Sequence, residues 1–198
     1  MRALYIYGTG GHGGVLADIA HLRGYDEVIF LDDENPDFPN LEDIGKRQDI
    51  PVALAIESNH RRKVLFQKLK SMGLKIETLI HPSAIISKSA KIEEGCAVMA
   101  GVIINHGAIL EKGVIVNSGS IVEYKSTLKE FSNIAPRVAI ARNVVVESLT
   151  HIGIGSSIIQ DIKIGSESII GAGSVVVSDI LSNVVAYGVP CKMQKKRN

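Results

Sequence analysis

A repeat of six residues fills most of the second half of the chain and constrains its fold more than any other feature. Seventeen consecutive positions, each six residues after the last, are Ile, Leu or Val, and they run from Ile80 to Val176. Neither the 3.6-residue period of a helix nor the two-residue period of a strand produces this spacing. A fixed hexad is typical of a β-solenoid, in which each hexad supplies one short flat strand and one corner. The repeat therefore predicts an all-β left-handed parallel β-helix.

Three hexads make one triangular coil, so residues 18 apart in the sequence are expected to stack in neighbouring coils. A small or β-branched residue follows each aliphatic one by four positions, as at Ala84, Cys96 and Ser120. We expect the aliphatic side chains to point into the prism and the small ones to fill its corners. One coil cannot bury its apolar face alone, so the coils must stack and end in a cap. Residues 184–192 are expected to form that cap.

A βαβ unit is predicted before the repeat. Residues 3–7 are expected to form a buried strand that leads into a helix, and residues 27–31 a second strand. The turn before the helix carries the pattern G-x-G-x-x-G at Gly8, Gly10 and Gly13. Glycines let a ligand approach the backbone, and the helix N-terminus offers free N–H groups to an anion. The alternative is a tight turn that binds nothing.

The rest of the N-terminal half is too short for a second βαβαβ unit. Strands are expected around 50–56 and 75–80, with a helix at 59–72 between them and a polar loop at 34–49. A complete dinucleotide-binding fold needs two such halves. Half a Rossmann fold favours a mononucleotide or a nucleotide sugar over NAD.

Composition and length agree with two domains, which we expect at 1–79 and 80–198. The formal net charge of +1 gives no electrostatic argument for a nucleic-acid or membrane partner. The two cysteines lack metal-ligand spacing, and His21, His81 and His151 show no partner pattern, so we expect no metal. No secretory or membrane-spanning segment is recognisable, and we expect a cytoplasmic protein.

Several motifs together resemble a known family. They are the motif Gly8-x-Gly10-Gly11-His12-Gly13, the strand end Leu31-Asp32-Asp33, the 18-residue coils and the closing Gly188-Val189-Pro190. Along nearly its whole length the chain is similar to hexapeptide sugar acyltransferases of the sialic-acid O-acetyltransferase and UDP-4-amino-sugar N-acetyltransferase type. The resemblance implies a homotrimer of bacterial surface-glycan biosynthesis. It also implies acetyl-CoA as co-substrate, bound along the prism between two subunits, and a nucleotide sugar acylated on an amino or hydroxyl group.

The resemblance also implies binding residues for both substrates. Those for the nucleotide sugar are Gly10, Gly11, His12, Gly13, Asp32, Asp33, Asn59 and Arg62. Those for the CoA thioester are Arg137, Arg142, Gly153, Gly155, Gly171, Gly173 and Pro190. Along one 18-residue column, glycines at 101, 119, 155 and 173 flank Arg137, which predicts an open edge interrupted by one arginine.

The reaction centre departs from the family pattern. Family members carry a catalytic histidine with an acidic neighbour, followed by a second histidine. This chain has Tyr124, Lys125 and Asn133 at the matching positions. Tyrosine, with an ordinary pKa near 10, is a poor base at neutral pH. The candidate catalytic residues are Tyr124, His106, Asn117 and Asn133, and His106 lies one coil from Tyr124.

Three hypotheses follow from this departure. The chain is an active acyltransferase with a rearranged centre, in which His106 or a perturbed Tyr124 takes the proton or positioning alone suffices. Alternatively, it has lost catalysis and binds a nucleotide sugar as a regulatory or structural partner. As a third possibility, Arg137 and Arg142 lie beside the thioester groove and bind the carboxylate or phosphate of a different donor.

Overall fold

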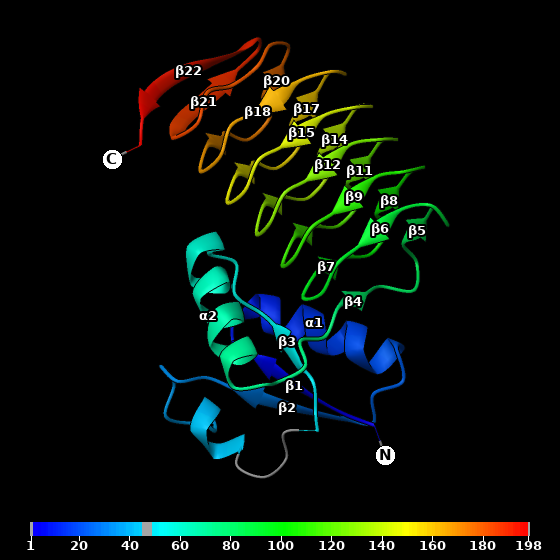
Figure 1. Ribbon diagram of the computed structural model, residues 1–198, viewed down its shortest axis with the longest axis vertical. Coiled ribbons are helices and arrows are strands. Elements are labelled where there is room, and N and C mark those ends of the chain that lie inside the picture. Colours follow the sequence, from blue (N-terminus) through cyan, green and yellow to red (C-terminus); the bar gives the residue numbers. More distant parts are fainter. Residues whose placement is uncertain (1, 45–48, 198) are drawn as a thin grey trace.

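The computed structural model describes residues 2–44 and 49–197, which form an α/β part and a prism stacked along one long axis (Figure 1). In the α/β part, strands β1 (Ala3–Tyr7), β2 (Glu27–Leu31) and β3 (Val52–Leu54) are parallel and lie in the order β2-β1-β3. Three helical segments accompany them: α1 (Gly11–Leu22), the 3₁₀ turn η1 (Leu41–Ile44) and α2 (Asn59–Ser71).

The prediction that residues 75–80 form a further strand of this sheet is wrong. Only Ile76 makes an isolated bridge to Val52, and the chain then enters the prism at β4 (Leu79–Ile80). The reason is that the hexad repeat already begins at Ile80 and pairs β4 with β7. In the described part of the chain, the N-terminal sheet therefore has three strands.

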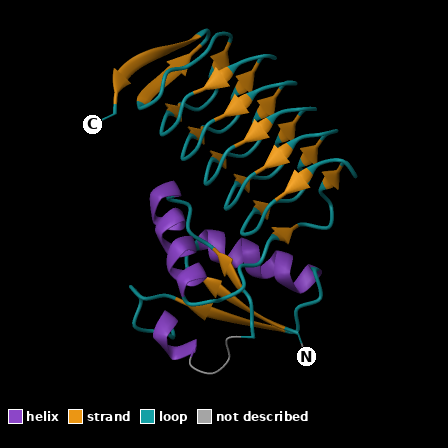
Figure 2. Ribbon diagram, in the orientation of Figure 1, coloured by secondary structure: helices purple, strands orange, loops and turns teal. Residues whose placement is uncertain are grey.

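The prism has three faces, and each face is a sheet of parallel two-residue strands. Figure 2 shows these short strands stacked from coil to coil. The first face contains β4, β7 (Ala97–Val98), β10 (Ile115–Val116), β13 (Asn133–Ile134), β16 (His151–Ile152) and β19 (Ile169–Ile170). The second contains β5 (Ile85–Ile86), β8 (Ile103–Ile104), β11 (Ile121–Val122), β14 (Ala139–Ile140), β17 (Ser157–Ile158) and β20 (Val175–Val176). The third contains β6 (Lys91–Ile92), β9 (Ile109–Leu110), β12 (Thr127–Leu128), β15 (Val145–Val146) and β18 (Lys163–Ile164).

The predicted coil geometry is confirmed. Neighbouring strands on a face pair residues 18 apart, as in Asn133↔His151. The second residue of each strand from β7 to β20 is buried in the prism, and the small corner residues from Cys96 onward are buried as well. Corner hydroxyls satisfy buried backbone groups: Ser120 Oγ donates to Ala135 O at 2.9 Å, and Thr150 Oγ1 to Gly165 O at 2.7 Å.

A hairpin caps the last coil. Strand β21 (Val184–Gly188) continues the first face by pairing with β19, and β22 (Cys191–Lys196) returns antiparallel to it. The predicted cap at 184–192 is thus present and extends four residues further. The fold class expected from the sequence, a half-Rossmann unit followed by a parallel β-helix, is confirmed.

One buried arginine joins the two parts. The side chain of Arg62, on α2, is fully buried and donates from all three of its nitrogens. On the α/β side its acceptors are Ile56 O, Glu57 O and Asn59 Oδ1, and on the prism side Gly113 O, Phe131 O and Ser132 O. Burial lowers the pKa of Arg62 to about 10, so the guanidinium is charged at neutral pH.

We expect Arg62→Ala to lower the free energy of unfolding by about 3 kcal/mol or more. The truncation leaves the carbonyls of Gly113 and Phe131 buried without donors, and each such group costs about 1–3 kcal/mol. Urea denaturation followed by circular dichroism measures the change. Arg61→Ala is the matched control, because the neighbouring Arg61 is exposed and forms an ion pair with the exposed Glu34. Equal stability of the two variants would contradict the structural role of Arg62.

Candidate functional site

The glycine-rich turn lies where a ligand of an open α/β sheet binds. The strand order β2-β1-β3 places a topological switch point between the carboxyl ends of β1 and β3. Gly8 has a φ of +117°, and a Cβ there would lie 2.7 Å from Ala55 O. A Cβ on Gly13 would meet the Gly8 carbonyl. Gly10 and Gly11 have open space around them, so the start of α1 is accessible.

The two aspartates after β2 hold the loops around this turn. Asp32 Oδ2 accepts from Thr9 Oγ1 at 2.7 Å and from Thr9 N at 3.2 Å. Asp33 accepts from Leu41 N at 2.7 Å and from Lys68 Nζ at 3.2 Å. Despite partial burial, these hydrogen bonds hold the pKa of both carboxyl groups below the usual range. Both predicted residues therefore border the turn as ionised groups, and their contact with a ligand stays a prediction.

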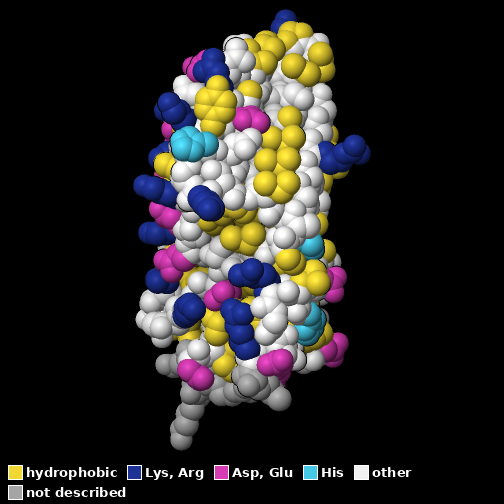
Figure 3. All heavy atoms as spheres, turned by 90° about the vertical axis from the view of Figure 1, so that its right-hand side faces the viewer, with side chains coloured by type: hydrophobic (Ala, Val, Ile, Leu, Met, Phe, Trp, Pro, Cys, Tyr) yellow, Lys and Arg dark blue, Asp and Glu magenta, His cyan; other side chains and the backbone are white. Residues whose placement is uncertain are grey.

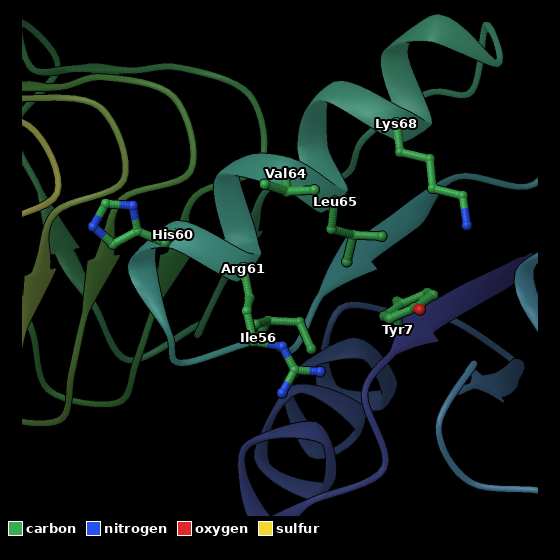
Figure 4. A pocket seen from close by; sticks show the side chains of 7 residues that line it. All are labelled: Tyr7, Ile56, His60, Arg61, Val64, Leu65 and Lys68. Carbon is green, nitrogen blue, oxygen red and sulfur yellow. The ribbon is translucent and has the colours of Figure 1, made fainter.

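A cavity of about 300 Å³ opens beside the turn, between the end of β1 and helix α2 (Figure 4). Its lining comprises Tyr7, Ile56, His60, Arg61, Val64, Leu65 and Lys68. Burial and a hydrogen bond to Asp33 raise the pKa of Tyr7 to about 12, so its hydroxyl is a donor at neutral pH. Two cationic side chains and an apolar floor suit an anionic ligand with a flat ring.

The directions in which the side chains of Asn59 and Arg62 leave helix α2 correct the prediction for these two residues. Arg62 points into the joint with the prism and is fully buried, so it does not reach this cavity. Asn59 is also engaged, because its Nδ2 donates to Leu149 O at 2.9 Å and its Oδ1 accepts from Arg62. The cationic side chain at the cavity is the neighbouring Arg61. The predicted strand-to-helix turn was right, but the sequence did not indicate which of two adjacent arginines faces the cavity.

His12 contains an unsatisfied buried atom at the same edge. Its Nε2 is buried, and among residues 2–44 and 49–197 it has no hydrogen-bond partner. Burial lowers the pKa of His12, while Glu57 raises it and Arg62 lowers it further. The net effect is a lowered pKa of His12, so the imidazole is neutral near pH 7. A neutral ring with an unpaired nitrogen is suited to a hydrogen bond from or to a ligand.

The predicted catalytic residues are divided between different parts of the prism. Tyr124 and His106 share the corner between the second and third faces, where the Lys125 N–H donates to His106 O at 3.0 Å. The His106 ring is exposed, and its Nδ1 lies 2.7 Å from Ser89 Oγ. Asn117 lies on the corner between the first and second faces. A single chain therefore does not bring these three side chains together.

Asn133 lies elsewhere again, on the first face and against the α/β part. It is 8% exposed, and its Nδ2 is 3.4 Å from Glu57 O. The next strand places His151 beside it in register. No sequence pattern indicates that His151 and Glu57 lie close together, because their proximity depends on how the two parts pack.

The predicted glycine edge is present and open along part of its length. No atom lies within 4 Å of a Cβ placed on Gly155 or Gly173. Arg137 occupies the same corner with a φ of 58°, and its exposed side chain passes over Gly119, whose Cβ would be 3.8 Å from Arg137 Cγ. The residue thus adopts the left-handed conformation that glycine supplies in the other coils.

The other predicted CoA residues have different surroundings. Arg142 lies on the next corner and pairs with Asp161 at 3.0 Å, so one chain does not place Arg137 and Arg142 in one groove. Gly153 and Gly171 are required for packing, since a Cβ would lie 2.6 Å from Ala172 N and 2.7 Å from the Tyr187 side chain, respectively. Pro190 is exposed in the turn of the cap.

In ranges 2–44 and 49–197, no three His, Cys, Asp or Glu side chains are arranged to hold a metal ion. Within the same ranges, neither α1 nor α2 is long and apolar enough to cross a bilayer.

Comparisons with known proteins give consistent relatives. Residues 3–69 match the family described as the PglD N-terminal domain. A curated relative is the UDP-N-acetylbacillosamine N-acetyltransferase of Bacillus subtilis (strain 168), 36% identical over 112 residues. That match covers 50% of this chain and 52% of the relative, so the chain aligns with about half of the curated protein.

Two solved structures match over nearly the full length. The acetyltransferase domain of PglB from Neisseria gonorrhoeae FA1090, in complex with acetyl coenzyme A, is 33% identical with a TM-score of 0.92, and the match covers 98% of this chain and 99% of that one. PerB from Caulobacter crescentus, in complex with CoA and GDP-perosamine, is 31% identical with a TM-score of 0.91, covering 98% of each chain.

We expect the His12 ring to titrate below its ordinary pKa of 6.5, because burial disfavours the imidazolium. Glu57→Gln should lower this pKa further by removing the negative charge that partly offsets burial. Two-dimensional NMR of the ¹⁵N-labelled imidazole follows both titrations. Glu94→Gln removes a carboxylate that pairs with Lys70 and should leave the His12 titration unchanged. A pKa at or above the ordinary value would contradict the described burial.

Proposed function

The chain belongs to the hexapeptide sugar acyltransferase family, and on this premise we propose that it transfers the acetyl group of acetyl-CoA to a nucleotide-activated sugar. The acceptor is an amino group, as in the N-acetyltransferase relative. The reaction serves bacterial surface-glycan biosynthesis. We place the reaction in the cytoplasm.

The unpaired Nε2 of His12 is the observation that carries the proposal. It lies at the carboxyl edge of the sheet, next to the open glycines and the cavity of Tyr7, Arg61 and Lys68. A nucleotide sugar has a chemical group that matches each of these features. Its base fills the apolar cavity, and its sugar bonds to His12. Its diphosphate lies at the α1 N-terminus, near Arg61 and Lys68, which pair with Glu34 and Asp33 in the chain alone.

The distribution of the predicted catalytic residues supports a homotrimer. Tyr124 and His106 lie on one corner, and Asn117 and the glycine edge on another, so a corner of a second copy is needed to join them. The second face of the prism offers a surface for such contacts, since its outward residues include Ile85, which is 65% exposed, and the half-buried Ile103 and Ile121. Figure 3 shows hydrophobic side chains gathered on a face of the prism.

The proposed chemistry is acyl transfer by direct attack. The amine nitrogen attacks the thioester carbonyl carbon, a C–N bond forms, and the C–S bond breaks to release the CoA thiol. The phenol O–H of Tyr124 can donate a hydrogen bond to the carbonyl oxygen as negative charge develops. Its side chain is 43% exposed, as contact with a bound substrate requires.

A second function is favoured by two departures of this chain from the family pattern. Tyr124 and Asn133 stand where the family has histidines, while the nucleotide edge is retained. The alternative is a protein that binds a nucleotide sugar without turning it over and acts as a partner of other enzymes.

Release of free CoA thiol, measured with acetyl-CoA and a series of UDP- and GDP-4-amino sugars, tests the proposed reaction. We expect turnover with at least one sugar. We also expect His12→Ala to raise KM for that sugar about tenfold, because about 1.4 kcal/mol of hydrogen bonding is lost. His81→Ala, on the first coil of the prism, is the control and should leave KM unchanged. Nucleotide-sugar binding without turnover favours the alternative function.

The same assay tests the two predicted corner residues. If Tyr124 stabilises the oxyanion, Tyr124→Phe lowers kcat by tenfold or more, as removal of an oxyanion donor does. A loss of turnover in His106→Ala but not in Tyr124→Phe identifies His106 as the group that takes the proton.

Arg137→Gly should separate stability from CoA binding. We expect it to stabilise the protein by about 1 kcal/mol, because glycine adopts the left-handed φ without a steric penalty. We expect it to weaken CoA binding severalfold if Arg137 contacts the phosphates at the glycine edge. Lys125→Gly is the matched control, since Lys125 has a φ of 59° on a different corner. Thermal unfolding and calorimetric titration measure the two effects, and equal CoA affinities of the two variants contradict the Arg137 contact.

A further inference from the structure

His151 is a histidine on the prism that faces the α/β part. It lies on the first face, one coil from Asn133 and paired with it in register. Its side chain lines a second cavity of about 200 Å³ at the joint of the two parts. The other lining residues are Glu57, Ser58, Asn59, His60, Leu149, Ile169 and Arg197. This volume is enough for one sugar ring.

Hydrogen bonds hold the segment that carries Glu57 in front of this face. The Glu57 carbonyl accepts from Arg62 Nη1 at 2.9 Å and from Asn133 Nδ2 at 3.4 Å. Glu57 follows β3 and precedes α2, so it lies at the carboxyl edge of the sheet, as does His12. Its charge acts on both histidines, which places the carboxylate within electrostatic range of each ring.

The surroundings of His151 suit proton transfer. Within residues 2–44 and 49–197, no group is hydrogen-bonded to its ring, so a nitrogen is free to accept. Burial lowers its pKa, Glu57 raises it, and Arg62 lowers it. The other charged or titratable groups facing this cavity are His60, which pairs with Glu167 at 3.4 Å, and Arg197. The net effect is a lowered pKa of His151, which leaves the ring neutral. Glu57 can stabilise the imidazolium after protonation.

We propose that His151, assisted by Glu57, accepts the proton from the sugar amine during acyl transfer. The inference rests on the proposed acetyltransferase function. As the C–N bond forms, the amine proton passes to the His151 imidazole, and the imidazolium then returns it to the departing thiolate. The base lost at positions 124 and 133 is thus replaced by a histidine one coil further along the same face as Asn133.

The test compares His151→Gln, Glu57→Gln and the control His81→Gln by the pH dependence of kcat and KM. We expect His151→Gln to lower kcat about a hundredfold or more, with KM for the sugar little changed, because general-base catalysis contributes about 10²–10⁴-fold. The neutral ring is the active form, so wild-type activity falls as the pH drops through the pKa of His151. This acidic limb should be absent in His151→Gln. In Glu57→Gln it should move to lower pH, since removing the carboxylate lowers that pKa.

The outcomes distinguish this inference from the proposed function. No turnover by the wild type with any sugar overturns both. Wild-type turnover with an unchanged kcat and acidic limb in His151→Gln overturns only the role of His151. Loss of the acidic limb in His106→Ala instead of His151→Gln does the same. A thermal unfolding midpoint of His151→Gln equal to that of the wild type confirms that the loss of activity is not a loss of fold.

Discussion

The buried guanidinium of Arg62 holds the α/β part on the prism, and the geometry of the site depends on it. Its donors reach backbone carbonyls of both parts, which a long planar cation can do and a hydrophobic side chain cannot. Burying a charge is unfavourable unless its hydrogen bonds are satisfied. Here every donor nitrogen of Arg62 has an oxygen acceptor, and these acceptors come from both parts. That arrangement brings the edge of the three-stranded sheet to the first face of the prism.

The packing of the α/β part on the prism explains why polar and titratable side chains lie together at one place. His12 lies at the N-terminal end of α1, and Glu57 lies just before α2. Both residues follow strands that end at the same edge of the sheet. The prism contributes Asn133 and His151 from adjacent coils. In the proposed function, the nucleotide lies along the sheet edge and its sugar reaches the prism, an arrangement that follows from the packing of the two parts.

The stacked coils also explain how residues on the exposed turns of the prism can vary without loss of fold. The inward aliphatic residues and the buried corner hydroxyls stabilise each coil, whereas Tyr124, Lys125 and Arg137 lie on exposed turns. Changes at those turns leave the core untouched. The strain of a non-glycine residue with positive φ, as at Lys125 and Arg137, is small compared with the stacking of whole coils.

The sequence by itself determined the prism, its 18-residue register, the βαβ unit and the glycine-rich turn, because each follows from a local period or a short motif. The strand expected at 75–80 was misassigned because it overlaps the start of the hexads. Only the tertiary structure decided that Arg61 faces the cavity and Arg62 the joint, since adjacent helical residues differ by about 100° in direction. It alone placed Glu57 opposite His151. Those residues lie far apart in the sequence, and no periodicity links a loop of one part to a strand of the other.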